Sequence, residues 1–457
     1  MHGTHGKSSL AAYAGGLALV AAIGVAACQG HSSPIASGSP SPSSVGRSTV
    51  IIPASVNWSA ARASLPTAAK RVSGQFAQLT DVSCPTVGTC VAVGGVKASG
   101  DVTQGLIEML SDSTWTPTTV PGLSSRSGAA PLNAVSCRAQ VTCVAVGFVG
   151  SATNVFTPVI ETLSGGRWSR VKPPLPDDAA TTASATLNDI ACPAAGTCVA
   201  TGWYVNQGGD RNGYVDMLSN GTWTAASAVL PKDAASEQSS AAASTFLAAV
   251  SCAGVGACVA SGQYRDTHGQ TRALIETLSG GAWTATAAPL PADAAATGQV
   301  SGLWAVDCPS PGACVAAGHY IVRGGQPRFL TDTLAGGAWT AAAIPLPAEA
   351  AADQKWSQYV STTVGGLACP SAGYCVASAG YVTKANQIVP VIETLSDGAW
   401  TPVVAPLPAD AAPGTGQGNA AYLELVTCPA AGHCLIAGSY PADDGTVEGL
   451  IEVSVPG

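Results

Sequence analysis

Seven pairs of cysteines, each with five residues between its members, divide the chain into repeats. The first cysteines of successive pairs lie 53 to 61 residues apart. This period fits a four-stranded blade of a β-propeller and exceeds that of most helical repeats. The pairs are Cys84 and Cys90, Cys137 and Cys143, Cys192 and Cys198, Cys252 and Cys258, Cys308 and Cys314, Cys369 and Cys375, and Cys428 and Cys434.

Cys28 stands outside these pairs and follows an apolar stretch, Leu17–Ala27, which is preceded by the positive charge of Lys7. This organisation is typical of a signal peptide, predicted at residues 1–27. Val25-Ala26-Ala27-Cys28 resembles a bacterial lipobox, which implies that Cys28 is lipidated and becomes the new N-terminus. The alternative is an ordinary signal peptide cut near Ala27, with release of the protein. The stretch is too short to predict a membrane span.

Export places the seven pairs in an oxidising compartment, where closely spaced cysteines form disulfides. Each bridge closes a loop of about seven residues, for which the chain-entropy model gives on the order of 2 kcal/mol of stabilisation. Structural zinc usually needs shorter spacings and four converging ligands. The repeat region has only His268, His319 and His433, at unrelated repeat positions. We therefore predict seven disulfides, no metal site and no cofactor.

Residues 28–49 are rich in Ser, Pro and Gly and lack the apolar content of a core. They are predicted to be a lipidated tether. Residues 50–457 form the repeat domain. After cleavage of the signal peptide, which contains Lys7, the mature chain has 18 basic and 27 acidic residues. This balance disfavours nucleic acid and anionic lipid as partners, so we expect membrane contact only through the lipid anchor.

Each repeat contains four short apolar runs that fit β-strands, because Gly and Pro interrupt every window long enough for a helix. In the fourth repeat these strands, a to d, are Leu247–Cys252, Cys258–Tyr264, Ala273–Leu278 and Ala282–Ala285. Ser279-Gly280-Gly281 supplies the turn from c to d, where glycine permits positive φ. Four antiparallel strands per repeat predict an all-β, seven-bladed β-propeller.

The two ends of the chain are predicted to complete one blade together. The last repeat stops near Val453 without a tryptophan strand, whereas Val56–Ala60 carries a tryptophan in the same local pattern. The N-terminal strand would therefore close the ring and remove the edges of an open sheet. With it, the strand-d tryptophans number seven: Trp58, Trp115, Trp168, Trp223, Trp283, Trp339 and Trp400.

The repeats are similar to uncharacterised exported propeller repeats of actinobacterial type, which share Ser-Cys-Pro followed by Gly-x-Cys-x-Ala-x-Gly, as in Ser83–Gly94. This resemblance implies no activity. Ser396-Asp397-Gly398-Ala399-Trp400 weakly resembles the Asp-box of sialidase-like propellers, with a contracted spacing. The arginines do not form the cluster that a sialidase uses for its substrate carboxylate, so that activity is not carried over.

Three residue patterns recur from blade to blade and are predicted to be structural. One acid lies in every strand c, seven residues before the tryptophan in intact hairpins, where the indole N–H, a threonine hydroxyl or a loop N–H could satisfy it. A tyrosine follows the second cysteine by six residues in five repeats, which indicates packing. Asp or Glu in the segment after strand d is expected to be solvated. The strand-c acids are Glu108, Glu161, Asp216, Glu276, Asp332, Glu393 and Glu452.

A ligand is expected on the face formed by the b–c and d–a loops, because variable loops on a rigid scaffold usually carry binding. An aromatic beside polar residues in the longest d–a loop suits stacking on a sugar ring or anchoring a protein partner. This aromatic is Trp356, and the alternative for it is packing over the rim of the blade. The candidate ligand-binding residues are Trp356, Tyr359, His319, Arg265, Asp266 and Arg211.

The sequence thus predicts a monomeric, surface-anchored lipoprotein that binds an envelope glycan or an exported protein without catalysis. No segment matches a nucleophile elbow, P-loop, zincin helix or dinucleotide fingerprint. One alternative is a propeller enzyme, a glycoside hydrolase or polysaccharide lyase, whose residues converge in one pocket. Another is a structural envelope protein without a small ligand.

Overall fold

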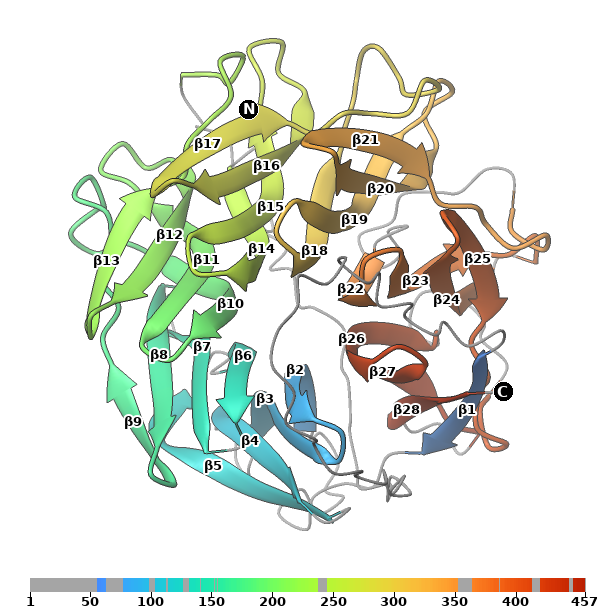
Figure 1. Cartoon of the computed structure of the whole chain (residues 1–457), viewed down its shortest axis with the longest axis horizontal. Helices are drawn as coiled ribbons and strands as arrows, with labels where there is room; N and C mark the ends of the chain where they lie inside the picture. The colour runs from blue at the N-terminus through green and yellow to red at the C-terminus, as the bar shows by residue number, and fades with distance from the viewer. Residues whose placement is uncertain are drawn as a thin grey trace, which may run out of the picture.

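The chain forms a ring of seven blades, as the sequence predicts (Figure 1). The computed structural model describes residues 56–62, 77–97, 103–111, 114–125, 131–139, 141–151, 153, 155–236, 245–351, 364–385, 387–412, 420–443 and 447–456. Their 28 strands make seven four-stranded antiparallel sheets. The proposed signal peptide and tether lie outside these residues. None of the described residues belongs to a helix long and apolar enough to cross a membrane.

Each blade runs from strand a, nearest the centre, to strand d at the rim. Blades 1 and 2 comprise β2 (Ala77–Thr86), β3 (Thr89–Lys97), β4 (Thr103–Ser111) and β5 (Thr114–Ser125), then β6 (Leu132–Ala139), β7 (Thr142–Gly150), β8 (Phe156–Ser164) and β9 (Arg167–Val171). Blades 3 and 4 comprise β10 (Ala185–Ala194), β11 (Thr197–Val205), β12 (Arg211–Ser219) and β13 (Thr222–Ser227), then β14 (Phe246–Gly254), β15 (Ala257–Arg265), β16 (Thr271–Ser279) and β17 (Ala282–Ala287).

Blades 5 and 6 comprise β18 (Gly302–Ser310), β19 (Ala313–Ile321), β20 (Pro327–Ala335) and β21 (Ala338–Ala343), then β22 (Val364–Ser371), β23 (Tyr374–Val382), β24 (Ile388–Ser396) and β25 (Ala399–Val404). Blade 7 comprises β26 (Tyr422–Ala430), β27 (His433–Pro441), β28 (Val447–Pro456) and β1 (Val56–Arg62). The strands predicted for the fourth repeat are confirmed in type and order.

The N-terminal strand closes the ring. β1 pairs antiparallel with β28, with Val56 opposite Pro456 and Arg62 opposite Leu450. Figure 1 shows the blue β1 beside the red β28. The predicted division of one blade between the two ends of the chain is confirmed.

The a–b and c–d turns, which lie at the same end of the blades, are both tight. All seven predicted disulfides form across the a–b turns, with S–S distances of 2.02–2.10 Å. In the c–d turn of blade 4, Gly280 and Gly281 have φ of 60° and 81°. Two successive positive φ values characterise the type I′ hairpin turn. Asp397 and Gly398 have the same conformation, so the segment that resembles an Asp-box is an ordinary c–d turn of this family of hairpins.

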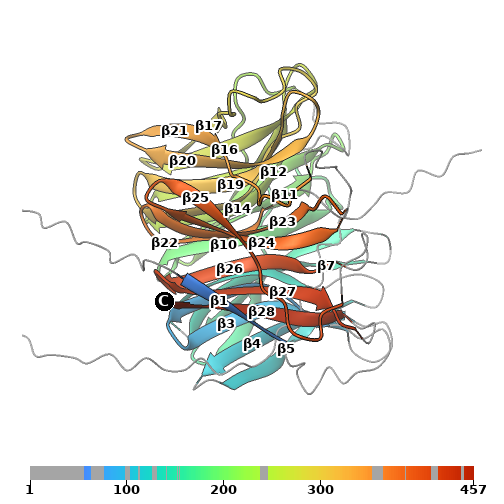
Figure 2. The same ribbon diagram turned by 90° about the vertical axis from the view of Figure 1, so that its right-hand side faces the viewer.

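The apolar core lies between successive blades. At the interface of blades 3 and 4, Cys258, Ala260 and Tyr264 of β15 pack with Val199 and Val215 of blade 3. Small residues on one face of a blade therefore pack against β-branched residues of the preceding blade, and similar clusters lie between blades 2 and 3 and between blades 4 and 5. Figure 2 shows the ribbons of neighbouring blades side by side. Among the described residues, six such layers lie between successive blades from blade 1 to blade 7, instead of a single central core.

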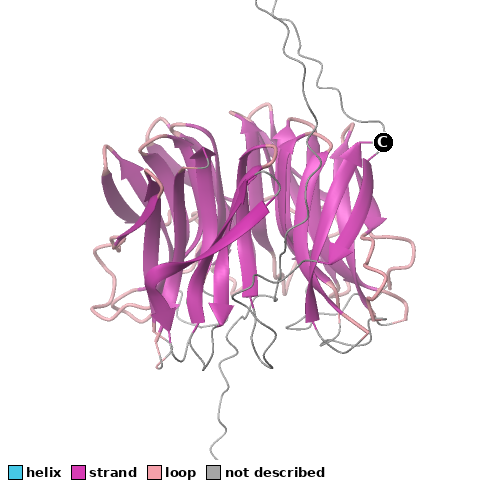
Figure 3. Cartoon of the chain, turned by 90° about the horizontal axis from the view of Figure 1, so that it is seen from below, coloured by secondary structure: helices cyan, strands magenta, loops and turns pink. Residues whose placement is uncertain are grey.

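The two ends of the ring differ. The a–b and c–d turns share one end, called here the disulfide end, and the b–c and d–a connections share the other, called the loop end. Figure 3 shows short turns at the end that carries the C-terminal label and longer connections opposite. Because β1 pairs with β28 with Val56 beside Pro456, the N-terminal strand begins at the disulfide end.

Candidate binding site at the loop end

A pocket of about 370 Å³ lies at the loop end of blade 4. Its polar lining comes from the segment after β13, the turn between β15 and β16, and the start of β16, and its opposite wall is residues 296–298. Its volume lies in the range of roughly 300–1,000 Å³ that ligand pockets occupy. The polar lining residues are Asp233, Asp266, His268, Gln270 and Arg272, with Thr297 in the opposite wall.

Asp266 shapes the turn that forms the floor of the pocket. Its side chain is 2% exposed, and Oδ1 accepts hydrogen bonds from the backbone N–H groups of His268 at 2.9 Å and Gln270 at 2.8 Å. Its Oδ2 lies 3.7 Å from Nη1 of Arg272. An aspartate that bonds its own downstream backbone fixes a tight turn. The exposed His268 is thereby held at the pocket edge.

A buried tyrosine positions the second carboxylate. The Tyr264 hydroxyl donates to Oδ1 of Asp233 at 2.9 Å, which joins blade 4 to the segment that follows blade 3. Burial raises the pKa of Tyr264, and the neighbouring guanidinium of Arg272 opposes that rise. Arg272 lies opposite Tyr264 in the β15–β16 ladder, and its buried Nε has no hydrogen-bond partner among the described residues. The pocket therefore combines two placed carboxylates with a guanidinium that already lies beside one of them, Asp266.

The opposite wall is held by Gln299. Its amide donates to the carbonyl oxygens of Ala295 at 3.2 Å and Ile321 at 3.0 Å, and its backbone N–H donates to Oε1 of Gln270 at 3.0 Å. The backbone N–H of Thr271 also donates to the Gln299 carbonyl at 3.1 Å. These bonds tie residues 296–298 to the b–c turn, so both sides of the pocket are rigidly spaced.

The link between tyrosine and carboxylate recurs around the loop end. The expectation that acids after strand d are solvated is therefore incomplete, because the recurring tyrosines donate to them across blade interfaces. Both patterns recur at fixed positions in the same repeats, which is the signal in the sequence that could link them. The other pairs are Tyr204 and Asp178, Tyr320 and Asp293, Tyr381 and Glu349, and Tyr440 and Asp410, at 2.7–2.9 Å.

Of the six predicted ligand residues, Asp266 is the one that lines this pocket. The guanidinium of Arg211 lies 4.1 Å from the ring centre of Trp203, and burial lowers its pKa. The backbone carbonyl of Arg265 accepts a hydrogen bond from the backbone N–H of Ala235 at 2.9 Å, which ties the start of the β15–β16 turn to the segment after β13. Trp356 and Tyr359 lie outside the described residues, so their role stays a prediction.

His319 lies inside the protein. It is 1% exposed, and its Nδ1 accepts a hydrogen bond from Nε1 of Trp304 at 2.9 Å. Burial lowers the pKa of His319 to about 4, which keeps the imidazole neutral at neutral pH. In this position it packs with Trp304 and does not reach the loop-end surface.

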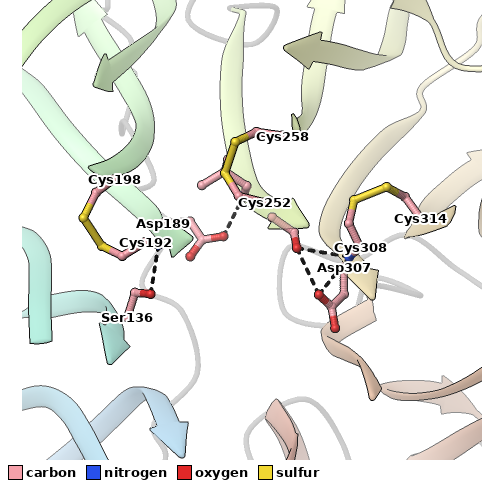
Figure 4. Close-up of a disulfide and its surroundings, with 11 residues drawn as sticks. Ser136, Asp189, Cys192, Cys198, Cys252, Cys258, Asp307, Cys308 and Cys314 are labelled. Carbon is pink, nitrogen blue, oxygen red and sulfur yellow. Dashed lines mark hydrogen bonds between the residues drawn. A yellow bond between two sulfur atoms is a disulfide. The ribbon is translucent and has the colours of Figure 1, made fainter. Parts of the chain in front are cut away.

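A second cavity, of about 330 Å³, lies in the central channel at the disulfide end. Asp307, which lines it, accepts the backbone N–H groups of Cys308 at 2.8 Å and Cys369 at 2.7 Å, and so clasps blades 5 and 6. Asp189 clasps blades 3 and 4 in the same way through Ile190 and Val250, each at 2.7 Å (Figure 4). These carboxylates hold neighbouring blades, rather than only water as channel residues usually do.

Burial also raises the pKa of the channel aspartates, to about 7 for Asp81 and about 6 for Asp189, with a smaller opposing effect of their backbone hydrogen bonds. No group of three or more His, Cys, Asp or Glu side chains within the described ranges is arranged to hold a metal ion. Because Asp189 and Asp307 already accept backbone N–H groups of neighbouring blades, the loop-end pocket is the candidate site considered further.

Similar proteins were found by structure alone. No known protein family and no curated protein matches the sequence. A protein of unknown function from Dyadobacter fermentans is 12% identical, with a TM-score of 0.42, over 81% of this chain and 92% of its own. The GH93 alpha-L-arabinofuranosidase of Fusarium graminearum is 11% identical, with a TM-score of 0.39, over 86% and 95%.

The fucose-specific lectin from Aleuria aurantia is 12% identical, with a TM-score of 0.35, over 69% of this chain and 89% of its own. At these identities and TM-scores the likeness is too remote to carry an activity to this protein, and fold alone does not imply function.

Proposed function

We propose that the protein is exported, anchored through a lipid on Cys28, and binds an envelope glycan at the loop-end pocket without catalysis. The observation that carries this proposal is the pocket of blade 4, where Asp233, Asp266 and Arg272 converge on a surface held by rigid turns. Sugar hydroxyls both donate and accept hydrogen bonds, so a lining that offers carboxylate acceptors beside guanidinium and imidazole groups suits them.

The two carboxylates favour binding over catalysis. Asp266 is committed to the backbone of its own turn, and Asp233 accepts the hydroxyl of Tyr264. A general acid or base must exchange a proton with the substrate from within hydrogen-bond reach. Groups that already hold the turn and the blade interface are better placed to orient hydroxyls than to move protons.

The position of the chain end supports the anchored arrangement. The N-terminal strand begins at Val56, at the disulfide end, so residues before it join the ring on the side opposite the pocket. A lipid on Cys28 would therefore attach to the disulfide end, and the pocket would face away from the membrane. Seven disulfides fit the oxidising environment that export provides.

The test is a glycan array and an envelope pulldown with the exported protein, beside Arg272→Ala. The matched control is Arg167→Ala, which removes an exposed arginine at the disulfide end. We expect Arg272→Ala to lose the ligand and Arg167→Ala to keep it, with all three proteins folded. A glycan held equally by all three would refute the site. Capture of an exported protein alone would replace the glycan as partner, and no capture would favour a structural role.

A glycoside hydrolase or polysaccharide lyase is the second candidate, because the pocket does bring two carboxylates to an arginine and a histidine. Glycans retained on the array would be incubated with the protein and assayed for new reducing ends or unsaturated sugars. Turnover that Asp266→Asn abolishes, while the fold is kept, would establish catalysis. Retention without turnover would support the binding protein.

The anchor has its own test. Mass spectrometry of the exported protein should find a lipid on Cys28, and Cys28→Ser should release the protein into the medium. Release of the parent protein as well would show an ordinary signal peptide.

A further inference from the structure

The strand-c acids lie in apolar surroundings between the blades. Glu276 is 0% exposed, and its strand neighbours Leu274 and Leu278 pack with Val199 and Val215 of blade 3. The seven acids share this place on the strand, and each is at most 2% exposed: Glu108, Glu161, Asp216, Glu276, Asp332, Glu393 and Glu452.

Most of these carboxyls have no hydrogen-bond partner among the described residues. In five of them neither oxygen has a partner, and in Glu108 one oxygen has none. The expected partner, the strand-d indole, does not reach: Trp283 lies opposite Leu278, whereas Glu276 lies opposite Ala285, and Nε1 of Trp283 is itself without a partner. The five acids with both oxygens unpaired are Asp216, Glu276, Asp332, Glu393 and Glu452.

Blade 2 is the exception. Nε of Arg170 donates to Oε1 of Glu161 at 2.6 Å, and the same guanidinium bonds the Gly122 carbonyl of blade 1 at 3.0 Å. The phenol of Tyr214 lies near Asp216. The backbone N–H of Val229 lies near Glu276 without the geometry of a hydrogen bond, and it opposes the rise in the pKa of that acid. Around the other acids the described residues present no charged group that shifts their pKa.

Ionising a carboxyl in such a place is strongly unfavourable, because the charge leaves bulk solvent and, among the described residues, only Glu161 has a cation beside it. Burial accordingly raises the pKa of the acids above the usual value for a carboxyl. At Glu161 the ion pair with Arg170 works against that rise. The pKa is about 7 for Glu108 and Asp332 and about 8 for Asp216, Glu276, Glu393 and Glu452.

We propose that the strand-c acids form a proton-dependent lock between the blades, which is closed while they are neutral and loosens when a rise in pH ionises them. Each acid binds its proton more tightly in the folded ring than in the unfolded chain. For Glu276, the stabilisation is therefore fully present below the unfolded pKa of 4.5 and is lost as pH rises through about 8. An exported protein meets external pH directly, so its ring would be firmest under acidic conditions.

The test measures urea unfolding of the exported protein, disulfides intact, at pH values from 5 to 9. One proton released per acid makes the unfolding equilibrium constant rise about tenfold per pH unit. We compare the parent with the triple variant Glu276→Gln, Glu393→Gln, Glu452→Gln, which keeps the side-chain shape but cannot ionise. Between pH 5 and 7, we expect the variant to release about three fewer protons on unfolding. Equal pH dependence in parent and variant would overturn the proposal.

Glu161→Gln is the matched control, because it removes the one acid that has a cationic partner. We expect it to destabilise the ring at every pH and to change the proton count by less than one. Asp81, Asp189 and Glu424 titrate in the same sense as the lock and His319 in the opposite sense. These four groups are present in the parent and in the variants. A difference in the number of protons released on unfolding therefore comes from the substituted acids.

The infrared spectrum of the folded parent gives a second readout if the triple variant does not fold. Protonated side-chain carboxyl should be present at pH 6, fall to about half near pH 8 and disappear at higher pH. Its absence at pH 6 would refute the lock, because the acids would then be ionised while buried.

Discussion

The disulfide end and the loop end of this propeller differ in which features recur from blade to blade. At the disulfide end the blades share one chemistry: a bridge across the a–b turn and, in the c–d turns, paired positive-φ residues such as Gly280 and Gly281. At the loop end the turn sequences differ from blade to blade, while the tyrosine–carboxylate bond beneath them is constant in five blades. A constant bond under a variable turn allows the surface to change without loosening the ring.

The exposed side chains of the two ends differ in the same way. Apolar tips stand out at the disulfide end, where Val87, Val141 and Val255 are 51%, 54% and 65% exposed. Charged and polar groups surround the loop-end pocket. The disulfide end carries the bridges that brace the blades, and the proposed function adds anchoring to this end and recognition to the loop end. Each of these roles can be tested separately.

Reduction of the disulfides should have the largest effect. Each seven-residue loop contributes about 2 kcal/mol in the chain-entropy model, and the seven together are comparable with the roughly 5–15 kcal/mol stability of a typical protein. We expect a strong reductant to unfold the ring at 37 °C, as measured by circular dichroism during heating. An unchanged melting temperature after complete reduction would show that the blade interfaces suffice.

Asp307→Ala should have the next largest effect, because it leaves the backbone N–H of Cys369 buried without its partner. A buried unsatisfied donor costs about 1–3 kcal/mol. We expect urea unfolding to show a loss of that size, while loop-end binding is retained once the protein is folded. Asp177→Ala, which removes an exposed acid at the loop end, is the control and should leave stability within about 0.5 kcal/mol.

The features of the disulfide end could be predicted from the sequence, whereas the pocket at the loop end could not. The cysteine period, the Gly-Gly turns and the tryptophan at Trp58 are local signals, and they predicted the ring, its closure and its bridges. The pocket joins Asp233, which follows blade 3, to Arg272 and Tyr264 of blade 4, and a contact across blades has no local signal. The tyrosine and the acid were both visible as recurring positions, but only the ring geometry brings them together.

Two of the loop-end tyrosines can be compared directly, with a smaller expected loss of stability than for Asp307→Ala. Tyr264→Phe removes the bond to Asp233 beside the pocket, and Tyr440→Phe removes the same bond to Asp410 elsewhere on the ring. One hydrogen bond contributes about 1 kcal/mol, so we expect similar losses of stability in urea unfolding. Glycan affinity, measured by calorimetry, should fall only for Tyr264→Phe, because there the carboxylate that lines the pocket is released. Equal affinities would show that Asp233 does not contact the ligand.

His268→Ala should have the smallest effect on the fold and still test recognition. The side chain is exposed, and Asp266 is bonded to the backbone N–H of residue 268, which alanine retains. The turn should therefore keep its shape, with stability changed by less than about 0.5 kcal/mol. If the imidazole bonds a sugar hydroxyl, its loss should weaken binding about tenfold, the equivalent of about 1.4 kcal/mol. Thr267→Ala alters the neighbouring exposed position, and a matching loss there would mean that the turn, rather than the imidazole, carries the affinity.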